Sequence, residues 1–221
     1  MKKAIVSFVL SLMFPLVLFA DGYTSLWKQY NEAETKDLPK TQIKILNNII
    51  AQAKAGKSYG NLLKAEFDKV ATASGISDEL FQSELSALKK AAGEASAVDP
   101  ALAAVYNCAL GCSYSLVAKS HYKSDSKKLS REYFDKALAD PEMLASKKAL
   151  DYAPFVSEGV DSEIFGNDLL SLVGYYSERY ALLNDYYNKA GNRRASLVTA
   201  LWMLEKRVKA NPVKKVIKGN T

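Results

Sequence analysis

The chain has 221 residues, of which 48% are hydrophobic, and its 30 Lys and Arg residues against 24 Asp and Glu give a formal net charge of +6 at pH 7. Because the basic residues are spread along the chain with acidic residues among them, this charge argues against a nucleic-acid-binding surface. The length is sufficient for one ordinary hydrophobic core or a short stack of helical repeats.

The first twenty residues have the pattern of a Sec-type export signal. Lys2 and Lys3 precede an uncharged apolar run over residues 4–20, and the polar Asp21 follows. We therefore predict cleavage at or near Ala20 and an exported protein of the periplasm or cell envelope. The alternative is a retained membrane anchor, since the run is only slightly shorter than the roughly 20 residues that span a bilayer. Charged residues interrupt every later apolar run, so no membrane insertion is expected after signal cleavage.

Apolar residues recur at helical spacing through most of the chain, and no stretch alternates with period two for more than a few residues. This pattern predicts an all-α domain over residues 21–210. In the first half we expect helices over about residues 23–36, 38–56, 58–73, 77–90 and 99–119.

Two local features are expected at the ends of these helices. Asp37 is predicted to cap the second helix, and Pro39 is predicted to lie in its first turn, where a missing N–H does no harm. Residues 91–98 are small and polar, and they suggest a flexible joint before the fifth helix.

The fifth helix carries the clearest indication of a repeat. Leu110-Gly111 followed by Tyr114 matches the Leu-Gly-x-x-Tyr core of the first helix of a tetratricopeptide repeat, and Phe134-x-x-Ala137 resembles the second helix. The pattern predicts antiparallel helical hairpins stacked as a tetratricopeptide-like α-solenoid, with Gly111 at a close crossing that Ala137 faces. The alternative is a generic helical hairpin that needs a small residue at its crossing.

The C-terminal third is expected to hold two more long helical patterns. One opens at Asp168 and continues with helical spacing through Tyr187, and Gly191 ends it. The last helix covers about residues 193–210. Residues 211–221 have three lysines and little apolar surface, which predicts a flexible basic tail.

No residue set in the chain has the spacing of a catalytic, cofactor or metal site. Cys108 and Cys112 are the only cysteines, and on one helix their parallel Cβ directions do not give a disulfide torsion without strain. We expect both to be reduced and packed in the core, with a strained or intermolecular disulfide and a metal site as the alternatives. His121, the single histidine, is expected in an exposed loop. The sequence therefore predicts a protein without enzymatic activity and without a cofactor.

A cluster of tyrosines near the C-terminus is the best candidate for a partner-binding surface. The candidate residues are Tyr175, Tyr176, Tyr180, Tyr186, Tyr187, Arg193 and Arg194. Tyr and Arg are enriched in interface hot spots, and helical repeats bind partners on their concave faces. The alternative is that Tyr176, Tyr180 and Tyr187 fill the core between helices, with their hydroxyls at its edge.

Several segments share their pattern and order with a known family. They include Leu26-Trp27-Lys28-Gln29, Asp37-Leu38-Pro39-Lys40-Thr41, Ala104-Val105-Tyr106-Asn107, Leu129-Ser130-Arg131-Glu132-Tyr133-Phe134 and Asn167-Asp168-Leu169-Leu170. The chain resembles, over most of residues 23–208, the helical region that opens large bacterial alpha-2-macroglobulin-like proteins.

In that family the helical region precedes β-sandwich macroglobulin domains and often a thioester that traps proteases. Neither Cys108 nor Cys112 lies in a thioester-like motif, and no segment is rich in strand patterns, so the resemblance does not imply a protease trap in these residues. It implies an accessory helical module.

These observations favour a non-enzymatic, exported helical scaffold that contacts a protein or peptide partner and is associated with an alpha-2-macroglobulin-like envelope-defence protein. The second interpretation is an independent periplasmic tetratricopeptide-like adaptor that binds peptides or envelope proteins. An enzyme is the third interpretation, and it ranks last because the sequence shows no convergent set of polar residues.

Overall fold

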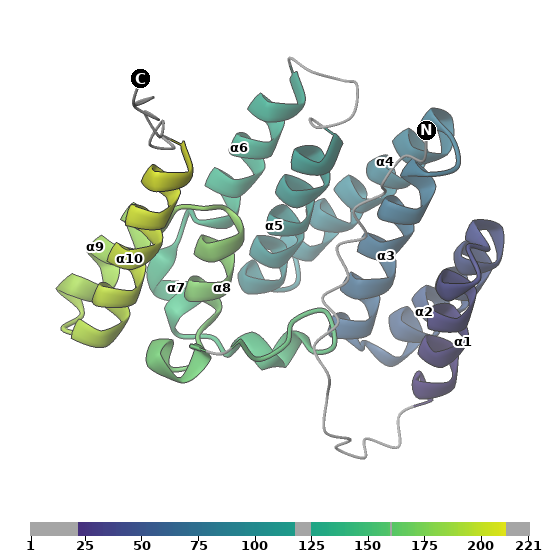
Figure 1. The fold of residues 1–221 in the computed structure, drawn as a ribbon. Helices are drawn as coiled ribbons and strands as arrows, with labels where there is room; N and C mark the ends of the chain where they lie inside the picture. The colour runs from purple at the N-terminus through teal and green to yellow at the C-terminus, as the bar shows by residue number, and fades with distance from the viewer. Residues whose placement is uncertain (1–21, 118–124, 160, 211–221) are drawn as a thin grey trace, which may run out of the picture.

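The computed structural model describes residues 22–117, 125–159 and 161–210. Within these ranges the protein is all-α, as predicted: ten α-helices pack in sequential antiparallel pairs, and there is no β-sheet (Figure 1). The predicted cleavage site at Ala20, His121 and the tail 211–221 lie outside the described residues.

The helices follow one another across the molecule from α1 to α10. Their bounds are α1 Thr24–Thr35, α2 Pro39–Gly56, α3 Tyr59–Ser74, α4 Asp78–Ser96, α5 Pro100–Val117, α6 Asp125–Ala137, α7 Pro141–Ala145, α8 Leu169–Tyr176, α9 Tyr180–Lys189 and α10 Arg193–Ala210. Two short 3-10 helices, η1 Ala149–Tyr152 and η2 Ser162–Phe165, lie between α7 and α8.

The core consists of two adjoining hydrophobic clusters. The smaller one joins α1, α2 and α3, and in it Leu46 and Ile49 are fully buried beside Tyr30. The larger one extends from α3 to α10 and includes the fully buried Leu110 and Leu169. Burial of one apolar stripe per helix against its neighbours is what holds such a stack together.

The prediction that Asp37 caps α2 is wrong. Asp37 has a positive φ of 52°, and the N–H of Leu38 donates to the carbonyl oxygen of Ala33 at 2.9 Å. This is the arrangement that closes the last turn of a helix, so Asp37 ends α1 instead of starting α2. Pro39 does lie in the first turn of α2, as predicted.

Residues 91–98 do not form a joint in the structure. Helix α4 continues as far as Ser96, and Ala92 and Ala95 are buried on the side that faces the rest of the core. The alanines that make this segment look flexible in sequence are small side chains that allow close helix packing. Alanine also has the highest intrinsic helix propensity.

Gly111 lies at a close helix crossing, as expected. A Cβ placed on Gly111 would lie within 2.5–2.9 Å of three carbon atoms of the Phe134 ring on α6. The hydroxyl of Ser130 donates to the carbonyl oxygen of Gly111 at 2.8 Å, and Ala137 is also buried. The residue that fills the space left by the glycine is therefore the Phe134 ring, and Ala137 lies one turn further along α6.

The connection between α7 and α8 packs back against α3, which lies far from it in sequence (Figure 1). A Cβ on Gly60, in the first turn of α3, would lie only 1.9 Å from the carbonyl oxygen of Ala153. Phe155 in the same connection packs edge-on against Phe67 of α3, with ring centroids 5.8 Å apart. The connection thus ties the two halves of the molecule together.

The single helical pattern predicted from Asp168 through Tyr187 is two helices, α8 and α9. Glu178 between them has a positive φ of 54°, and the N–H of Arg179 donates to the carbonyl oxygen of Gly174 at 2.9 Å. The chain turns there so that Leu183 of α9 packs onto Gly174 of α8. This turn also forms one wall of the site described next.

Candidate functional site

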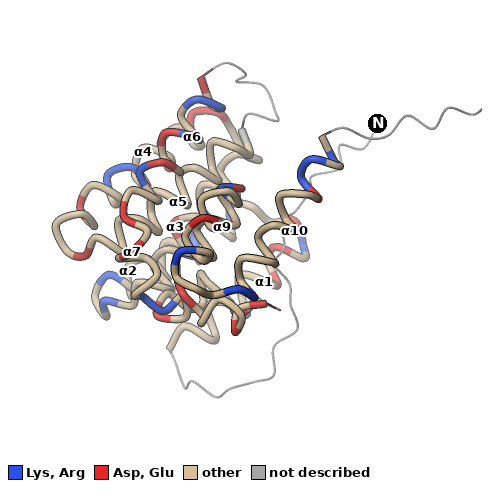
Figure 2. Tube along the Cα trace, turned by 90° about the vertical axis from the view of Figure 1, so that its left-hand side faces the viewer, with Lys and Arg blue, Asp and Glu red and all other residues tan. Residues whose placement is uncertain are grey.

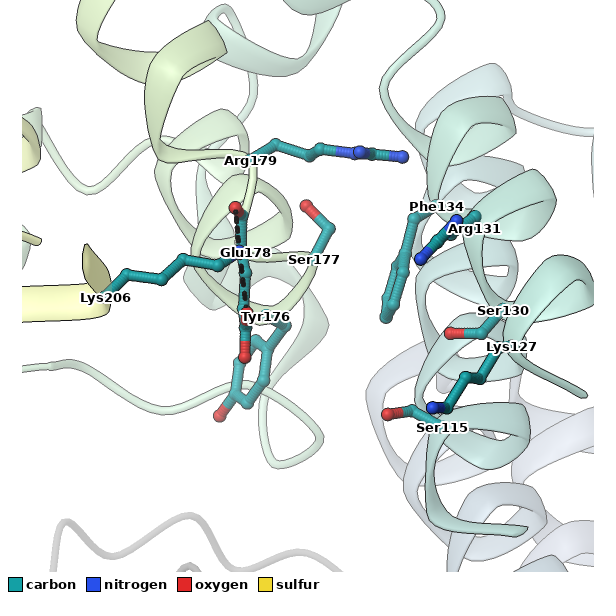
Figure 3. A pocket seen from close by; sticks show the side chains of 10 residues that line it. All are labelled: Ser115, Lys127, Ser130, Arg131, Phe134, Tyr176, Ser177, Glu178, Arg179 and Lys206. Carbon is teal, nitrogen blue, oxygen red and sulfur yellow. Dashed lines mark hydrogen bonds and ion pairs between the residues drawn. The ribbon is translucent and has the colours of Figure 1, made fainter. Parts of the chain in front are cut away.

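A groove of about 410 Å³ lies between α5 and α6 on one side and the α8–α9 turn with α10 on the other (Figure 3). It is lined by Ser115, Lys127, Ser130, Arg131, Phe134, Tyr176, Ser177, Glu178, Arg179 and Lys206. Its volume is within the range of ligand pockets, but its lining is mostly polar and charged, with two aromatic rings among these groups.

The apolar part of the groove is made by two aromatic rings from opposite walls. Phe134 from α6 is 8% exposed, and Tyr176 from the end of α8 is half-buried. Burial, with smaller contributions from the thiols of Cys112 and Cys108, raises the pKa of Tyr176 to about 12. Its hydroxyl is therefore neutral near pH 7 and can both donate and accept a hydrogen bond.

The α6 wall comes from one face of that helix. Lys127, Ser130, Arg131 and Phe134 are spaced i, i+3, i+4 and i+7, which places them on one side of a helix. None of these residues was among the candidates from sequence. The signal that could have identified them is this spacing, in which two basic residues accompany an aromatic residue.

The charges of the groove are only partly paired. Arg179 forms an ion pair with Asp135, and the Lys206 ammonium lies 2.8 Å from a carboxylate oxygen of Glu178. Lys127 and Arg131 are exposed, and neither has an acidic partner among the described residues. The α6 wall therefore presents two unpaired positive charges to whatever enters the groove.

The polar groups that line the groove include a serine from α5 and a lysine from α6. Ser115 and Lys127 both extend toward the groove from the same wall in Figure 3, which raises the question of a serine-lysine pair. Lysine acts as a general base where it is buried away from water, whereas Lys127 is exposed. The Ser130 hydroxyl is used in its hydrogen bond to Gly111. The groove is suited to binding through hydrogen bonds and charge.

Three of the predicted tyrosines lie around this groove. Tyr176 lines it, and Tyr175 and Tyr180 pack beside it on Trp202 of α10, with ring centroids 5.0 and 5.6 Å from the Trp202 ring. Tyr175 is 48% exposed, so part of this side chain is accessible. This group of rings continues the apolar floor of the groove onto the surface.

The structure does not place Tyr187 on the surface. Tyr187 is 3% exposed, and its hydroxyl lies 2.7 and 2.8 Å from the two carboxylate oxygens of Asp168. It fills the core between helices, which is the alternative that the sequence left open, so the assignment of Tyr187 as a partner-contacting residue is corrected. Tyr186 is half-buried, and its hydroxyl lies 3.1 Å from a carboxylate oxygen of Glu142 on α7.

Arg193 and Arg194 are exposed but do not join the tyrosines. They occupy the first turn of α10, and Trp202, around which Tyr175 and Tyr180 pack, lies about 12 Å further along the helix axis at a rise of 1.5 Å per residue. The seven residues grouped by sequence thus fall into the groove, the core, the contact with α7 and the start of α10.

Both cysteines have free thiols in the structure. Cys108 is buried and Cys112 is half-buried, one helical turn apart on α5. The hydrogen bond with Cys112 and burial together raise the pKa of the Cys108 thiol well above its usual range. Among the described residues, no three His, Cys, Asp or Glu side chains converge as metal ligands would.

None of the helices in the described ranges combines the length and the apolar character needed to cross a membrane. Comparison of the chain with protein families, curated proteins and solved structures finds no match.

Proposed function

We propose that the protein is a non-enzymatic, exported helical scaffold that binds an extended, acidic peptide segment of another protein in the groove between α6 and the α8–α9 turn. The observation that carries this proposal is the pair of unpaired cations, Lys127 and Arg131, beside the aromatic floor of Phe134 and Tyr176. Arginine binds carboxylates through two parallel hydrogen bonds, and aromatic rings supply contact area at little cost in conformational entropy.

A tetratricopeptide-like solenoid is the architecture that we propose for this scaffold. Two features support it: the helices pack as sequential antiparallel pairs, and glycines lie at two of the crossings. Gly111 receives Phe134, and Gly174 receives the side chain of Leu183 in the same manner. Stacked hairpins of this kind present grooves between successive pairs, and the proposed peptide site is such a groove.

For the biological setting we propose association with an alpha-2-macroglobulin-like envelope-defence protein, supported by the resemblance of residues 23–208 to the helical region of that family. The second candidate is an independent periplasmic adaptor, and the groove itself favours it because binding there needs no further domain. Reading the gene beyond the Thr221 codon tests this choice. An open frame encoding β-rich domains supports the first setting, and a stop codon beside envelope genes supports the second.

Site-specific photo-cross-linking in intact cells tests the groove. A photoreactive residue at Ser177, on the groove wall, should give a discrete cross-linked product with another envelope protein. The same residue at Ser86, an exposed position on α4 outside the groove, should not. Replacement of Arg131 by Glu should abolish the Ser177 product, whereas Lys128→Glu, which changes a neighbouring exposed lysine on α6, should leave it unchanged. Equal cross-linking from Ser86, or a product insensitive to Arg131→Glu, would exclude the groove as the binding site.

Export is tested separately. N-terminal sequencing of the protein from the envelope fraction should show a chain that begins at or near Asp21. A membrane-bound chain that still starts at Met1 would replace the exported scaffold with an anchored one.

A further inference from the structure

Helix α10 leaves a continuous apolar stripe uncovered. Leu197, Leu201, Leu204 and Val208 are 63, 51, 57 and 58% exposed, respectively. Scattered exposed leucines are common on protein surfaces, but a contiguous apolar patch is typical of an interaction site. The spacing of four, three and four residues is that of the a and d positions of a coiled coil, so all four side chains lie along one seam.

The stripe is distinct from the side of α10 that packs on the protein. Ala195, Thr199 and Trp202 face the core, and Lys206 on the same side reaches Glu178 at the groove. At 100° per residue these positions lie on the opposite side of the helix from the stripe. The stripe is therefore not part of the groove, and a ligand in one leaves the other free.

Charged residues at both ends of α10 determine which partner surface can pack favourably on the stripe. Residues 195–204 carry no charge; two arginines precede them, and Glu205 followed by three basic residues comes after them, so basic residues are in excess at both ends (Figure 2). Arg193 and Arg194 lie at the start of the helix, and Arg207 and Lys209 lie at its end. None of these four has an ion-pair partner within the part of the chain that the structure describes.

This charge pattern disfavours a second copy of the chain on the stripe. Antiparallel pairing of two α10 helices places Arg193 and Arg194 of one copy near Arg207 and Lys209 of the other, and parallel pairing places each basic end against itself. Both arrangements bring like charges together along the seam. A helix with acidic residues beside its apolar face instead pairs favourably at both ends.

We propose that the exposed face of α10 is a docking site for an acidic amphipathic helix of another protein. The occupant lays its own apolar stripe between Leu197 and Val208, and its carboxylates pair with Arg193 and Arg194 at one end and with Arg207 at the other. Binding of this kind uses the helix-in-groove mode, in which apolar anchors give affinity and flanking charges give specificity.

The test uses two synthetic helical peptides of about three heptads, with Leu at positions a and d and either Glu or Lys at e and g. Fluorescence anisotropy with the purified protein should show binding of the Glu peptide, about tenfold or more tighter than the Lys peptide, and this preference should decline with added salt. The double variant Leu201→Asn/Leu204→Asn should weaken binding of the Glu peptide about tenfold or more. The matched control, Leu38→Asn/Val98→Asn, changes residues that are 45 and 63% exposed elsewhere and should bind as the parent does.

Other results would overturn the proposal. Equal binding of the two peptides, or equal losses in the stripe and control variants, would show that α10 has no selective docking face. A dimer in sedimentation equilibrium that dissociates in Leu201→Asn/Leu204→Asn would assign the stripe to a second copy. Binding that occurs only after removal of residues 211–221 would assign it to the chain's own tail. Circular dichroism melting of each variant checks that the fold is retained, and the Ser177 cross-link reports separately on the groove.

Discussion

The Tyr187 hydroxyl lies 2.7 and 2.8 Å from the two carboxylate oxygens of Asp168, and both residues are buried. Asp168 also accepts a hydrogen bond from the backbone N–H of Ser171 at 2.7 Å, so one carboxylate caps α8 and anchors α9 to it. This pair sets the position of the α8–α9 turn and therefore of one wall of the groove.

Replacing Tyr187 with Phe should destabilise the protein by roughly 1–3 kcal/mol, because Asp168 stays buried and loses a donor. The ring is retained, so packing against Phe165 is kept. Urea unfolding at pH 7 measures the change. The matched control is Tyr175→Phe, which removes a hydroxyl from an exposed ring and should be close to neutral. Equal stabilities of Tyr187→Phe and the parent would mean that the Asp168 contact contributes nothing to stability.

The same carboxylate predicts a pH dependence. Burial raises the pKa of Asp168 above 3.8, although the hydrogen bonds from Ser171 and Tyr187 oppose this shift. The unfolded chain therefore releases the Asp168 proton at a lower pH than the folded protein does, and stability from this group falls as pH rises above 3.8 and through the folded pKa.

Asp168→Asn should remove this pH-dependent contribution, and its side-chain oxygen can still accept from the Ser171 N–H. Unfolding of the parent and the variant is compared from pH 4 upward. Burial also raises the pKa of Asp68, but this residue is present in both proteins, so its contribution cancels in the comparison. The stability of the parent should decline relative to the variant as pH rises, and parallel curves would contradict the prediction.

Cys108 should resist alkylation in the native protein. Reaction requires the thiolate, and hydrogen bonding to Cys112 together with burial raises the pKa of the Cys108 thiol. Iodoacetamide at neutral pH followed by mass spectrometry should label Cys108 far more slowly than in urea, with Cys112, which is half-buried, reacting first. A quantitative mass loss from a Cys108–Cys112 disulfide would contradict the expectation of reduced thiols.

Gly111→Leu should destabilise the protein by roughly 1–3 kcal/mol, because the new side chain would collide with the Phe134 ring. Leucine has a higher helix propensity than glycine by up to about 1 kcal/mol, so the two effects oppose each other. Gly93→Leu provides the control, since a Cβ there meets nothing within 4 Å and only the propensity effect remains. Thermal melting should show a lower Tm for Gly111→Leu and an equal or higher Tm for Gly93→Leu. A Gly111→Leu variant as stable as the parent would mean that the α5–α6 crossing is not closely packed.

The all-α class and most helix positions could be predicted because apolar periodicity and prolines mark them. Pro39, Pro100 and Pro141 each begin a helix. The turn at Glu178 was missed because this residue is not glycine, and Asp37 was assigned to the start of α2 for its capping side chain, yet both residues take the left-handed conformation that closes a helix. The hydrogen bonds that hold them there depend on how the next helix packs, which local sequence does not record.

Only part of the groove could be predicted from the sequence. Tyr176 was identified from the tyrosine cluster, but Arg131 and Lys206 come from helices far apart in the chain, and only the packing of α6 against the α8–α9 turn brings them together. Tyr187 was included because composition does not distinguish a buried tyrosine with a carboxylate partner from an exposed one. The spacing of the apolar residues in α10 shows in the sequence that they share one face of a helix. It does not show whether that face packs on the core or is exposed.

Gly60→Ala should show whether the α7–α8 connection is packed on α3. The added Cβ would lie 1.9 Å from the carbonyl oxygen of Ala153 and 2.7 Å from the carbonyl carbon of Tyr152, and these backbone atoms cannot rotate away as a flexible side chain can. We expect a loss of roughly 1–3 kcal/mol in the free energy of unfolding, despite the better helix propensity of alanine.

The control for this change is Gly93→Ala, where a Cβ has open space and alanine should stabilise the helix by up to about 1 kcal/mol. Limited proteolysis adds a local measurement, because Gly60→Ala should increase cleavage within residues 149–156 more than elsewhere if the connection is lifted from α3. If Gly60→Ala melts at or above the parent temperature and its connection is cut no faster, the connection does not bind α3 closely, and the two halves of the molecule are joined by helix packing alone.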